Sequence, residues 1–289
     1  MSKQDPHRDD PATTGHEWDG IQEFDNPLPR WWLWTFIATI VIAIAITIIY
    51  PAWPTFNGPT KGLIGYSSRA DVAADIQRFK AANEAVDTKL STVPLEDINK
   101  DPVLRSYAMN GGAAVFKTWC AQCHGQGANG VKMGSGYPNL IDDDWLWGGT
   151  IEAIHTTITH GIRSADDPDT RDSAMPQFGD ILEPSEIDQL VQHVRAISGQ
   201  SNDATSAKAG AALFADNCAA CHGDKGTGGR DVGAPNLTDA IWLYGGDVAS
   251  LTNTVTNAHY GIMPAWGGRL TESQIRQVAT FIHESGGGE

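Results

Sequence analysis

The sequence predicts an all-α protein, in which one N-terminal transmembrane helix is followed by two tandem helical domains. Three observations predict this class: an uncharged apolar segment near the N-terminus, two copies of one Cys-x-x-Cys-His motif, and a repeat of about a hundred residues around each motif. The 289 residues are 41% hydrophobic and 19% charged, which excludes both a disordered chain and a polytopic membrane protein. The net charge of −15 argues against a nucleic-acid binder, because such a protein needs a basic face for phosphates.

The membrane segment is predicted over residues 31–53. The stretch from Trp31 to Tyr50 carries no charge, and at ~1.5 Å per residue a helix of this length spans the hydrocarbon core of a bilayer. Aromatic residues at both ends are typical of a membrane interface, and Pro51 ends the helix. A hydrophilic stretch precedes the segment, which favours a retained anchor over a cleaved signal peptide.

The soluble part contains an internal repeat, which is seen when Cys218 is aligned with Cys120. Each copy continues through Pro-Asn-Leu, an aromatic Gly-Gly sequence and a Met-Pro pair to an amphipathic closing helix. In the first copy a polar, acidic insert at 163–174 precedes the Met-Pro pair and is predicted to be a surface loop. The predicted plan is an N-terminal segment 1–30, the membrane helix 31–53, a connector 54–105, and helical domains at 106–200 and 201–289.

Capping patterns predict where three helices begin. Ser68, Ser185 and Thr271 are each followed three residues later by Asp or Gln, and then by apolar residues at helical spacing. We expect one helix in the connector and the closing helix of each domain to begin at these residues.

Two motifs match the attachment pattern for c-type haem: Cys120-Ala-Gln-Cys123-His124 and Cys218-Ala-Ala-Cys221-His222. Two thiols at this spacing can each form a thioether with a haem vinyl group, and the following histidine then lies under the iron. A redox dithiol would need a βαβ context, which is missing, and a zinc site usually needs a second ligand pair close by. We therefore predict two covalently bound haem c groups.

A methionine is the expected second axial ligand of each iron, because methionine raises the reduction potential and suits electron transfer. Met175 and Met263 are the best candidates, since both precede proline and occupy equivalent positions in the repeat. His160 and His259 compete with them but are not at equivalent positions. The residues leave two arrangements open, one methionine for the haem of its own domain or an exchange between the domains.

Two prolines are expected to support the haem histidines. Pro138 and Pro235 occupy equivalent positions after the glycine-rich loops. Their backbone carbonyls can accept a hydrogen bond from Nδ1 of His124 and His222, which would orient each imidazole.

The residues before the membrane helix are the most specific feature of the chain. They read Trp-Asp-Gly-Ile-Gln-Glu-Phe-Asp-Asn-Pro-Leu-Pro-Arg-Trp-Trp from Trp18 to Trp32. With this string, one membrane helix and the tandem repeat, the chain resembles the dihaem subunit of cbb3-type cytochrome c oxidases, the CcoP/FixP family, over essentially its full length. Tandem cytochromes of the c4 type share the repeat but not the string.

The resemblance implies a noncatalytic electron-entry subunit with two cytochrome c domains. It would carry electrons from a donor cytochrome c or a bc1 complex toward the monohaem c subunit, and so to the haem–copper subunit that reduces oxygen. It also implies crosswise axial ligation, with His124 and Met263 on the first haem and His222 and Met175 on the second. The expected partners are these oxidase subunits, the donor and membrane lipid.

The side of the membrane follows from the haem chemistry. Haem attachment of this kind takes place outside the bacterial cytoplasm, which predicts an inner-membrane protein with a cytoplasmic N-terminus and periplasmic haem domains. Two other functions stay open at this stage, a free-standing anchored dihaem carrier and a dihaem peroxidase. Copurification with haem–copper subunits distinguishes an oxidase subunit from a free-standing carrier. A peroxidase would need one haem without a sixth ligand.

Overall fold

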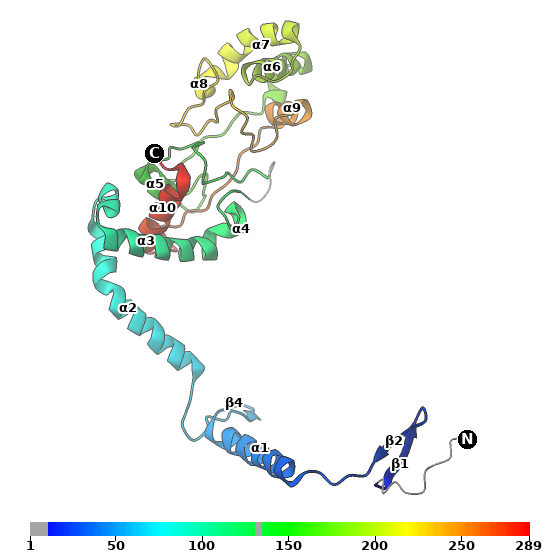
Figure 1. The fold of residues 1–289 in the computed structure, drawn as a ribbon. Helices are drawn as coiled ribbons and strands as arrows, with labels where there is room; N and C mark the ends of the chain where they lie inside the picture. The colour runs from blue at the N-terminus through cyan, green and yellow to red at the C-terminus, as the bar shows by residue number, and fades with distance from the viewer. Residues whose placement is uncertain (1–10, 131–134) are drawn as a thin grey trace. The chain divides into compact units, whose positions relative to one another are not determined.

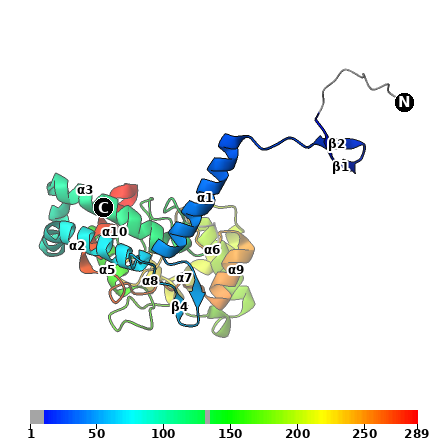
Figure 2. The same ribbon diagram turned by 90° about the horizontal axis from the view of Figure 1, so that it is seen from below.

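The computed structural model describes residues 11–130 and 135–289, and its ribbon confirms the predicted helical class (Figures 1 and 2). The chain divides into two compact units, one ending at Ala81 and the other running from Ala82 to Glu289. The boundary falls inside helix α2 (Ser68–Thr92), which begins at the residue that its capping pattern predicted. The two units are therefore described separately.

A short hairpin near the N-terminus was not predicted. Strands β1 (Thr13–Trp18) and β2 (Ile21–Phe24) pair antiparallel, and Trp18 lies opposite Ile21. The two turn residues, Asp19 and Gly20, have φ values of 52° and 83°. Positive φ at both positions is the type I′ turn that Asp-Gly favours, so this dipeptide was the available signal.

Helix α1 (Arg30–Ile49) has the length and composition of a membrane anchor. Its 20 residues have a mean hydropathy of 2.4, and none of them is buried within the described chain. The helix ends before the predicted limit at residue 53, because Tyr50 is extended (φ −102°, ψ 161°) ahead of Pro51. A second small hairpin, β3 (Pro54–Thr55) and β4 (Gly58–Pro59), follows it.

The C-terminal part of the predicted connector is packed into the second unit. The last turns of α2 and the 3₁₀ helix η1 (Leu95–Lys100) lie against α3 (Pro102–Val115). Four residues of this contact are fully buried: Leu90, Ile98, Leu104 and Ala108. The Asp87 carboxylate accepts hydrogen bonds from the Tyr107 hydroxyl (2.9 Å) and the Ser273 hydroxyl (2.6 Å), which ties α2 to the end of the chain.

The closing helices of the two repeats are exchanged. Helix α10 (Glu272–Ile282), from the second repeat, packs across α3 of the first, whereas α6 (Pro184–Ile197), from the first, packs across α7 (Ala204–Asn217) of the second (Figure 1). An equivalent glycine lies at each crossing. A Cβ on Gly112 would overlap the carbonyl oxygen of Gln277, and one on Gly210 would overlap that of Gln189.

The helices of the second unit form two bodies with separate cores, which can be followed in Figure 1. The first body contains α3, the π-helical turn η2 (Phe116–Cys120), α4 (Ala121–His124), α5 (Ile151–His160) and α10. The second body contains the 3₁₀ turn η3 (Phe178–Asp180), α6, α7, α8 (Ala219–His222) and α9 (Val248–Asn257). The second body is continuous in sequence, and the first has helices on both sides of it.

Each of the two predicted domains, 106–200 and 201–289, contributes helices to both bodies. The physical reason is that each closing helix buries its apolar face on the other repeat. In the first core, Val115, Phe116 and Ile154 of the first repeat pack with residues of the second: Trp266, Leu270, Ile275, Val278, Ala279 and Ile282. In the second core, Phe214 and Leu251 pack with residues of the first repeat: Ile187, Leu190, Val191 and Val194.

One of the two predicted closing-helix starts needs a correction. Helix α10 follows Thr271, whose side chain forms the predicted capping box with Gln274. Helix α6 begins at Pro184 instead, and its capping box joins Glu183 to Glu186. Proline favours the first helical position, so the helix starts ahead of the predicted Ser185.

Candidate functional site

Both Cys-x-x-Cys-His motifs lie on equivalent short helices that end at the histidine. Helix α4 ends at His124 and α8 at His222. The glycine that follows each histidine has a positive φ, 79° at Gly125 and 77° at Gly223. Glycine adopts this conformation without a steric cost, so it can end each helix and turn the chain away from the motif.

The two histidines are held by the carbonyls of the two predicted prolines. His124 Nδ1 lies 3.4 Å from the Pro138 oxygen, and His222 Nδ1 lies 3.0 Å from the Pro235 oxygen. A proton on Nδ1 leaves the Nε2 lone pair available to a metal. Burial lowers the pKa of both imidazoles, against a smaller opposite effect of the carbonyls, and so favours the neutral form that binds iron.

None of the four cysteines forms a disulfide. Burial, with a smaller contribution from the neighbouring thiol, raises the pKa of Cys120 and that of Cys218 to about 11. These thiols are therefore protonated at neutral pH. A dithiol redox centre reacts through a thiolate, so this environment disfavours that alternative.

Met263 lies in the first body, although it belongs to the second repeat. Its backbone N–H donates to the Ile162 carbonyl (3.0 Å), and the Ile162 N–H donates to the Met263 carbonyl (2.9 Å). Its half-buried side chain packs against the first core, as do Cys120 and Trp145. The structure thus brings Met263 and the first motif to the same core.

Met175 lies at the entry to the second body. It is half-buried and is followed, three residues later, by Phe178, the first residue of η3. Phe178 is buried, and η3 packs against α9. Met175 therefore lies next to the body that contains the second motif.

The two competing histidines are already engaged by local partners. His160 Nδ1 lies 3.2 Å from both carboxylate oxygens of Asp167. His259 Nδ1 lies 3.1 Å from the Thr254 hydroxyl, and its Nε2 lies 3.2 Å from the Asn253 amide nitrogen. Both ring nitrogens of His259 are engaged, which makes it a weaker candidate for an iron ligand than the methionines, whereas the contact of His160 involves Nδ1 only.

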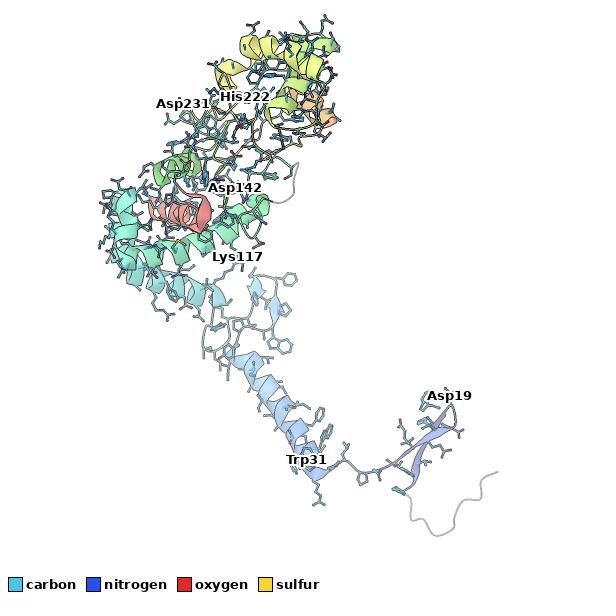
Figure 3. All side chains as sticks on the ribbon, turned by 45° about the horizontal axis from the view of Figure 1, so that its top comes forward. Asp19, Trp31, Lys117, Asp142, His222 and Asp231 are labelled. Carbon is cyan, nitrogen blue, oxygen red and sulfur yellow. The ribbon has the colours of Figure 1, made fainter. Side chains whose placement is uncertain are left out.

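The surroundings of both motifs fit a haem. Each motif borders an apolar core whose half-buried members include a cysteine of the motif and a tryptophan, Trp145 in the first and Trp242 in the second. Trp145 Nε1 donates to the Gly287 carbonyl, which fixes this ring against the C-terminal segment. Figure 3 shows His222 among the side chains of the second body. Thiol, imidazole and thioether donors on an apolar wall match the chemistry of a covalently bound porphyrin.

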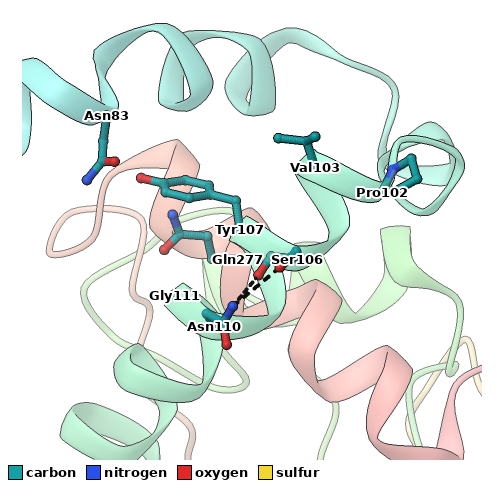
Figure 4. Close-up of a pocket in the computed structure, with 8 residues that line it drawn as sticks. All are labelled: Asn83, Pro102, Val103, Ser106, Tyr107, Asn110, Gly111 and Gln277. Atoms are coloured by element: carbon teal, nitrogen blue, oxygen red, sulfur yellow. Dashed lines mark hydrogen bonds between the residues drawn. The ribbon is translucent and has the colours of Figure 1, made fainter.

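A surface cavity of about 760 Å³ does not belong to these sites (Figure 4). It lies over α3 and α10, and its lining includes Tyr107, Asn110 and Gln277 but neither cysteine nor histidine. Asn110 Nδ2 donates within the cavity wall to the Ser106 carbonyl (2.9 Å). This lining offers no histidine, cysteine or methionine to an iron, so the cavity is not a candidate haem site.

Family models and relatives match the chain over its whole length. The model for the N-terminal domain of cytochrome oxidase-cbb3, FixP, matches residues 10–57, and the model for cytochrome c oxidase, cbb3-type, subunit III, matches residues 108–194 and 205–282. The cbb3-type cytochrome c oxidase subunit CcoP of Cereibacter sphaeroides is 60% identical over 100% of this chain and 98% of the relative. The chain belongs to the CcoP/FixP family. It accordingly binds two haem c groups, one for each cytochrome c domain.

Other members of the family show similar coverage. CcoP of Rhodobacter capsulatus is 52% identical over the full length of both chains. FixP of Azorhizobium caulinodans is 51% identical over 96% of this chain and 94% of the relative. The similarity therefore includes the N-terminal hairpin and membrane helix as well as both repeats.

The structural role of two arginines in the insert was not predicted from the sequence. Arg163 Nε donates to the Gly261 carbonyl (2.7 Å), whereas Arg171 Nη1 donates to the Trp147 carbonyl (3.1 Å), with its guanidinium 5.3 Å from the Trp147 ring. Burial lowers the pKa of both side chains. The predicted surface loop is thus fastened to both repeats, and two basic residues in an otherwise acidic insert were the available signal.

The acidic sequence before Trp145 leads to a testable pH dependence. Burial, followed by the charges of Asp239, Asp142 and Asp143, raises the pKa of Asp144 from 3.8 to about 6. The folded chain therefore binds this proton more tightly than the unfolded chain, so ionisation of Asp144 costs stability as the pH rises through about 4 to 6.

Asp144→Asn is expected to raise the melting temperature above about pH 6 and to change it little at about pH 3, below both pKa values, where the carboxyl is largely protonated in both states. Thermal unfolding of the haem-loaded chain and the variant at both pH values measures this difference. An equal change in melting temperature at the two pH values would contradict the raised pKa of Asp144.

Proposed function

We propose that this chain is the electron-entry subunit of its oxidase and has no oxygen chemistry of its own. The observation that supports this is one histidine and one candidate methionine for each motif, which together would leave neither iron an open coordination position. When bound, each haem supplies reversible one-electron chemistry.

We assign the ligands across the repeats. His124 and Met263 are the proposed axial pair of the first haem, because Met263 packs against the first core together with Cys120. His222 and Met175 are the proposed pair of the second, because Met175 lies three residues before η3, which packs in the second body. The proposed thioether residues are Cys120, Cys123, Cys218 and Cys221.

The remaining residues of the sites bind, orient and exclude water. Pro138 and Pro235 orient the imidazoles through their carbonyls. The two apolar cores keep water from the haem faces, and a dry environment with a thioether ligand raises the reduction potential. Both effects suit a carrier that accepts and passes on single electrons.

The proposed topology has residues 1–30 in the cytoplasm, α1 in the inner membrane, and the connector and both haem domains in the periplasm. Two findings support it, the single apolar helix and the requirement for haem attachment outside the cytoplasm. The relatives are named as oxidase subunits. We extend this assembly to the present chain, with the haem–copper subunit and the monohaem c subunit as neighbours and a cytochrome c or bc1 complex as donor.

Purification from membranes in a mild detergent tests this function. We expect the chain to copurify with a haem–copper subunit, and the reduced haems of the isolated chain to be low-spin and unreactive toward carbon monoxide. A chain that carries two haems but copurifies with no oxidase subunit would instead be a free-standing carrier. Turnover of hydrogen peroxide, with one high-spin haem, would instead indicate a peroxidase.

A further inference from the structure

The two repeats touch through a reciprocal contact between an aromatic ring and a glycine. Trp147 and Tyr244 occupy equivalent positions in the repeat, and so do Gly136 and Gly233. A Cβ on Gly136 would lie 2.6 Å from Tyr244 Cε1, and one on Gly233 would overlap Trp147 Cε2. Each ring therefore rests directly on a glycine of the other repeat, in space that no other residue type leaves free.

Each of these glycines belongs to the loop that supports a haem histidine. Gly136 lies two residues before Pro138, whose carbonyl faces His124 Nδ1. Gly233 lies two residues before Pro235, whose carbonyl faces His222 Nδ1. Both glycines have a positive φ, 78° and 61°, so the two loops turn at the point where the ring rests.

The first of these loops has an additional tie to the other repeat. The Gly136 N–H donates to the carbonyl of Leu243 (3.1 Å), the residue before Tyr244. The contact with the Tyr244 ring and this hydrogen bond both restrain Gly136. The position of the Pro138 loop is therefore determined by the second repeat as well as by its own.

Both aromatic side chains are themselves held in place. Trp147 is half-buried, and the Arg171 guanidinium lies over its ring while donating to its carbonyl. Tyr244 is half-buried against the ring of His259, with centroids 4.9 Å apart, and His259 is held by Thr254. Because each ring is held in place by these neighbours, it can restrict the position of the glycine loop that it contacts.

We infer that Trp147 and Tyr244 are positioning residues that act across the repeats, Trp147 on His222 and Tyr244 on His124. This inference rests on the proposed function, because it assumes that the two histidines bind iron. The hydrogen bond from Nδ1 to a carbonyl increases electron donation by the imidazole and favours oxidised iron. Loosening the loop weakens this bond and raises the reduction potential of the haem in the opposite repeat.

Redox titration of the full-length, haem-loaded chain tests this. Trp147→Ala is expected to shift the reduced-to-oxidised ratio of the second haem, at a fixed potential, by about threefold or more toward the reduced form. Tyr244→Ala is expected to do the same to the first haem. Trp147→Phe and Tyr244→Phe keep a ring over the glycine and should recover most of the parent value.

The two haem signals are assigned with Met263→His and Met175→His, each of which lowers the potential of one haem. Gly233→Ala should push the Trp147 ring away and reproduce the potential shift of Trp147→Ala. Gly136→Ala should do the same to the Tyr244 ring and reproduce the shift of Tyr244→Ala. Tyr260→Ala is the matched control, because Tyr260 is an exposed aromatic residue that neither glycine contacts.

Shifts confined to the haem of the mutated repeat, or no shift in a chain that still holds two haems, would overturn the inference. Intact mass separates this result from a failure of the proposed function. A parent chain without two covalent haems would remove the proposed function itself, whereas two haems with unshifted potentials would remove only the cross-repeat positioning.

Discussion

Replacing both cysteines of the second motif, with Cys218→Ser and Cys221→Ser, is expected to destabilise the first body as well as the second. A body of this size depends on its haem for much of its core and unfolds without it. Because the second body lies inside the sequence of the first, the first must then close an unfolded loop of about 100 residues between Ile162 and Met263. Loop closure of this length costs about 4 kcal/mol at 25 °C.

Denaturant titration, followed by the absorption of the remaining haem, measures this loss. The reciprocal variant, Cys120→Ser with Cys123→Ser, is the control. It is expected to change the stability of the second body by only about 1 kcal/mol, because that body is continuous from Phe178 to Asn257 and closes no such loop. Equal losses in the two variants would contradict the interleaved arrangement.

Met263→Leu is expected to make the first haem high-spin, although Met263 belongs to the second repeat. Leucine fills the space but provides no ligand, so the iron loses its sixth donor. The reduction potential should fall by a large part of the ~0.8 V range over which axial ligands set haem potentials. Absorption spectroscopy and potentiometry of the purified chain measure both changes.

The chain with Cys120→Ser and Cys123→Ser, which keeps only the second haem, identifies the ligand pairs. In this background Met175→Leu should produce a high-spin haem, and Met263→Leu should leave the coordination unchanged. The opposite result would mean that each methionine serves the haem of its own repeat.

Local sequence was sufficient for much of the fold. The helix starts at Ser68 and Thr271 and the membrane helix were predicted from capping and from the lack of charge, because these signals act over a few neighbouring residues. The hairpin was missed even though its Asp19-Gly20 turn is a strong local signal.

The exchange of closing helices could not be predicted from helix periodicity. Helices α6 and α10 have equivalent apolar faces, so either could cover either repeat. One signal was available in the connection between α6 and α7, which runs only from Ser198 to Asp203. A connection this short makes two helices antiparallel neighbours and joins the end of one repeat to the start of the next.

The candidate site was predictable only in part for a similar reason. The motif and proline residues lie close together in sequence, and the structure brings His124 to Pro138 and His222 to Pro235. Met263 reaches the first body through backbone hydrogen bonds with Ile162, a residue far away in sequence. The ring and glycine contacts likewise join different repeats, so a local pattern contains no information about them.

The discontinuous first body has a consequence for biogenesis. Helix α10 and Met263 leave the ribosome more than a hundred residues after Cys120 and Cys123. The first motif therefore stays uncovered by its closing helix until that helix has been synthesised. During this interval maturation enzymes can reach its thiols, and a premature stop before α10 would leave the first haem without its covering helix.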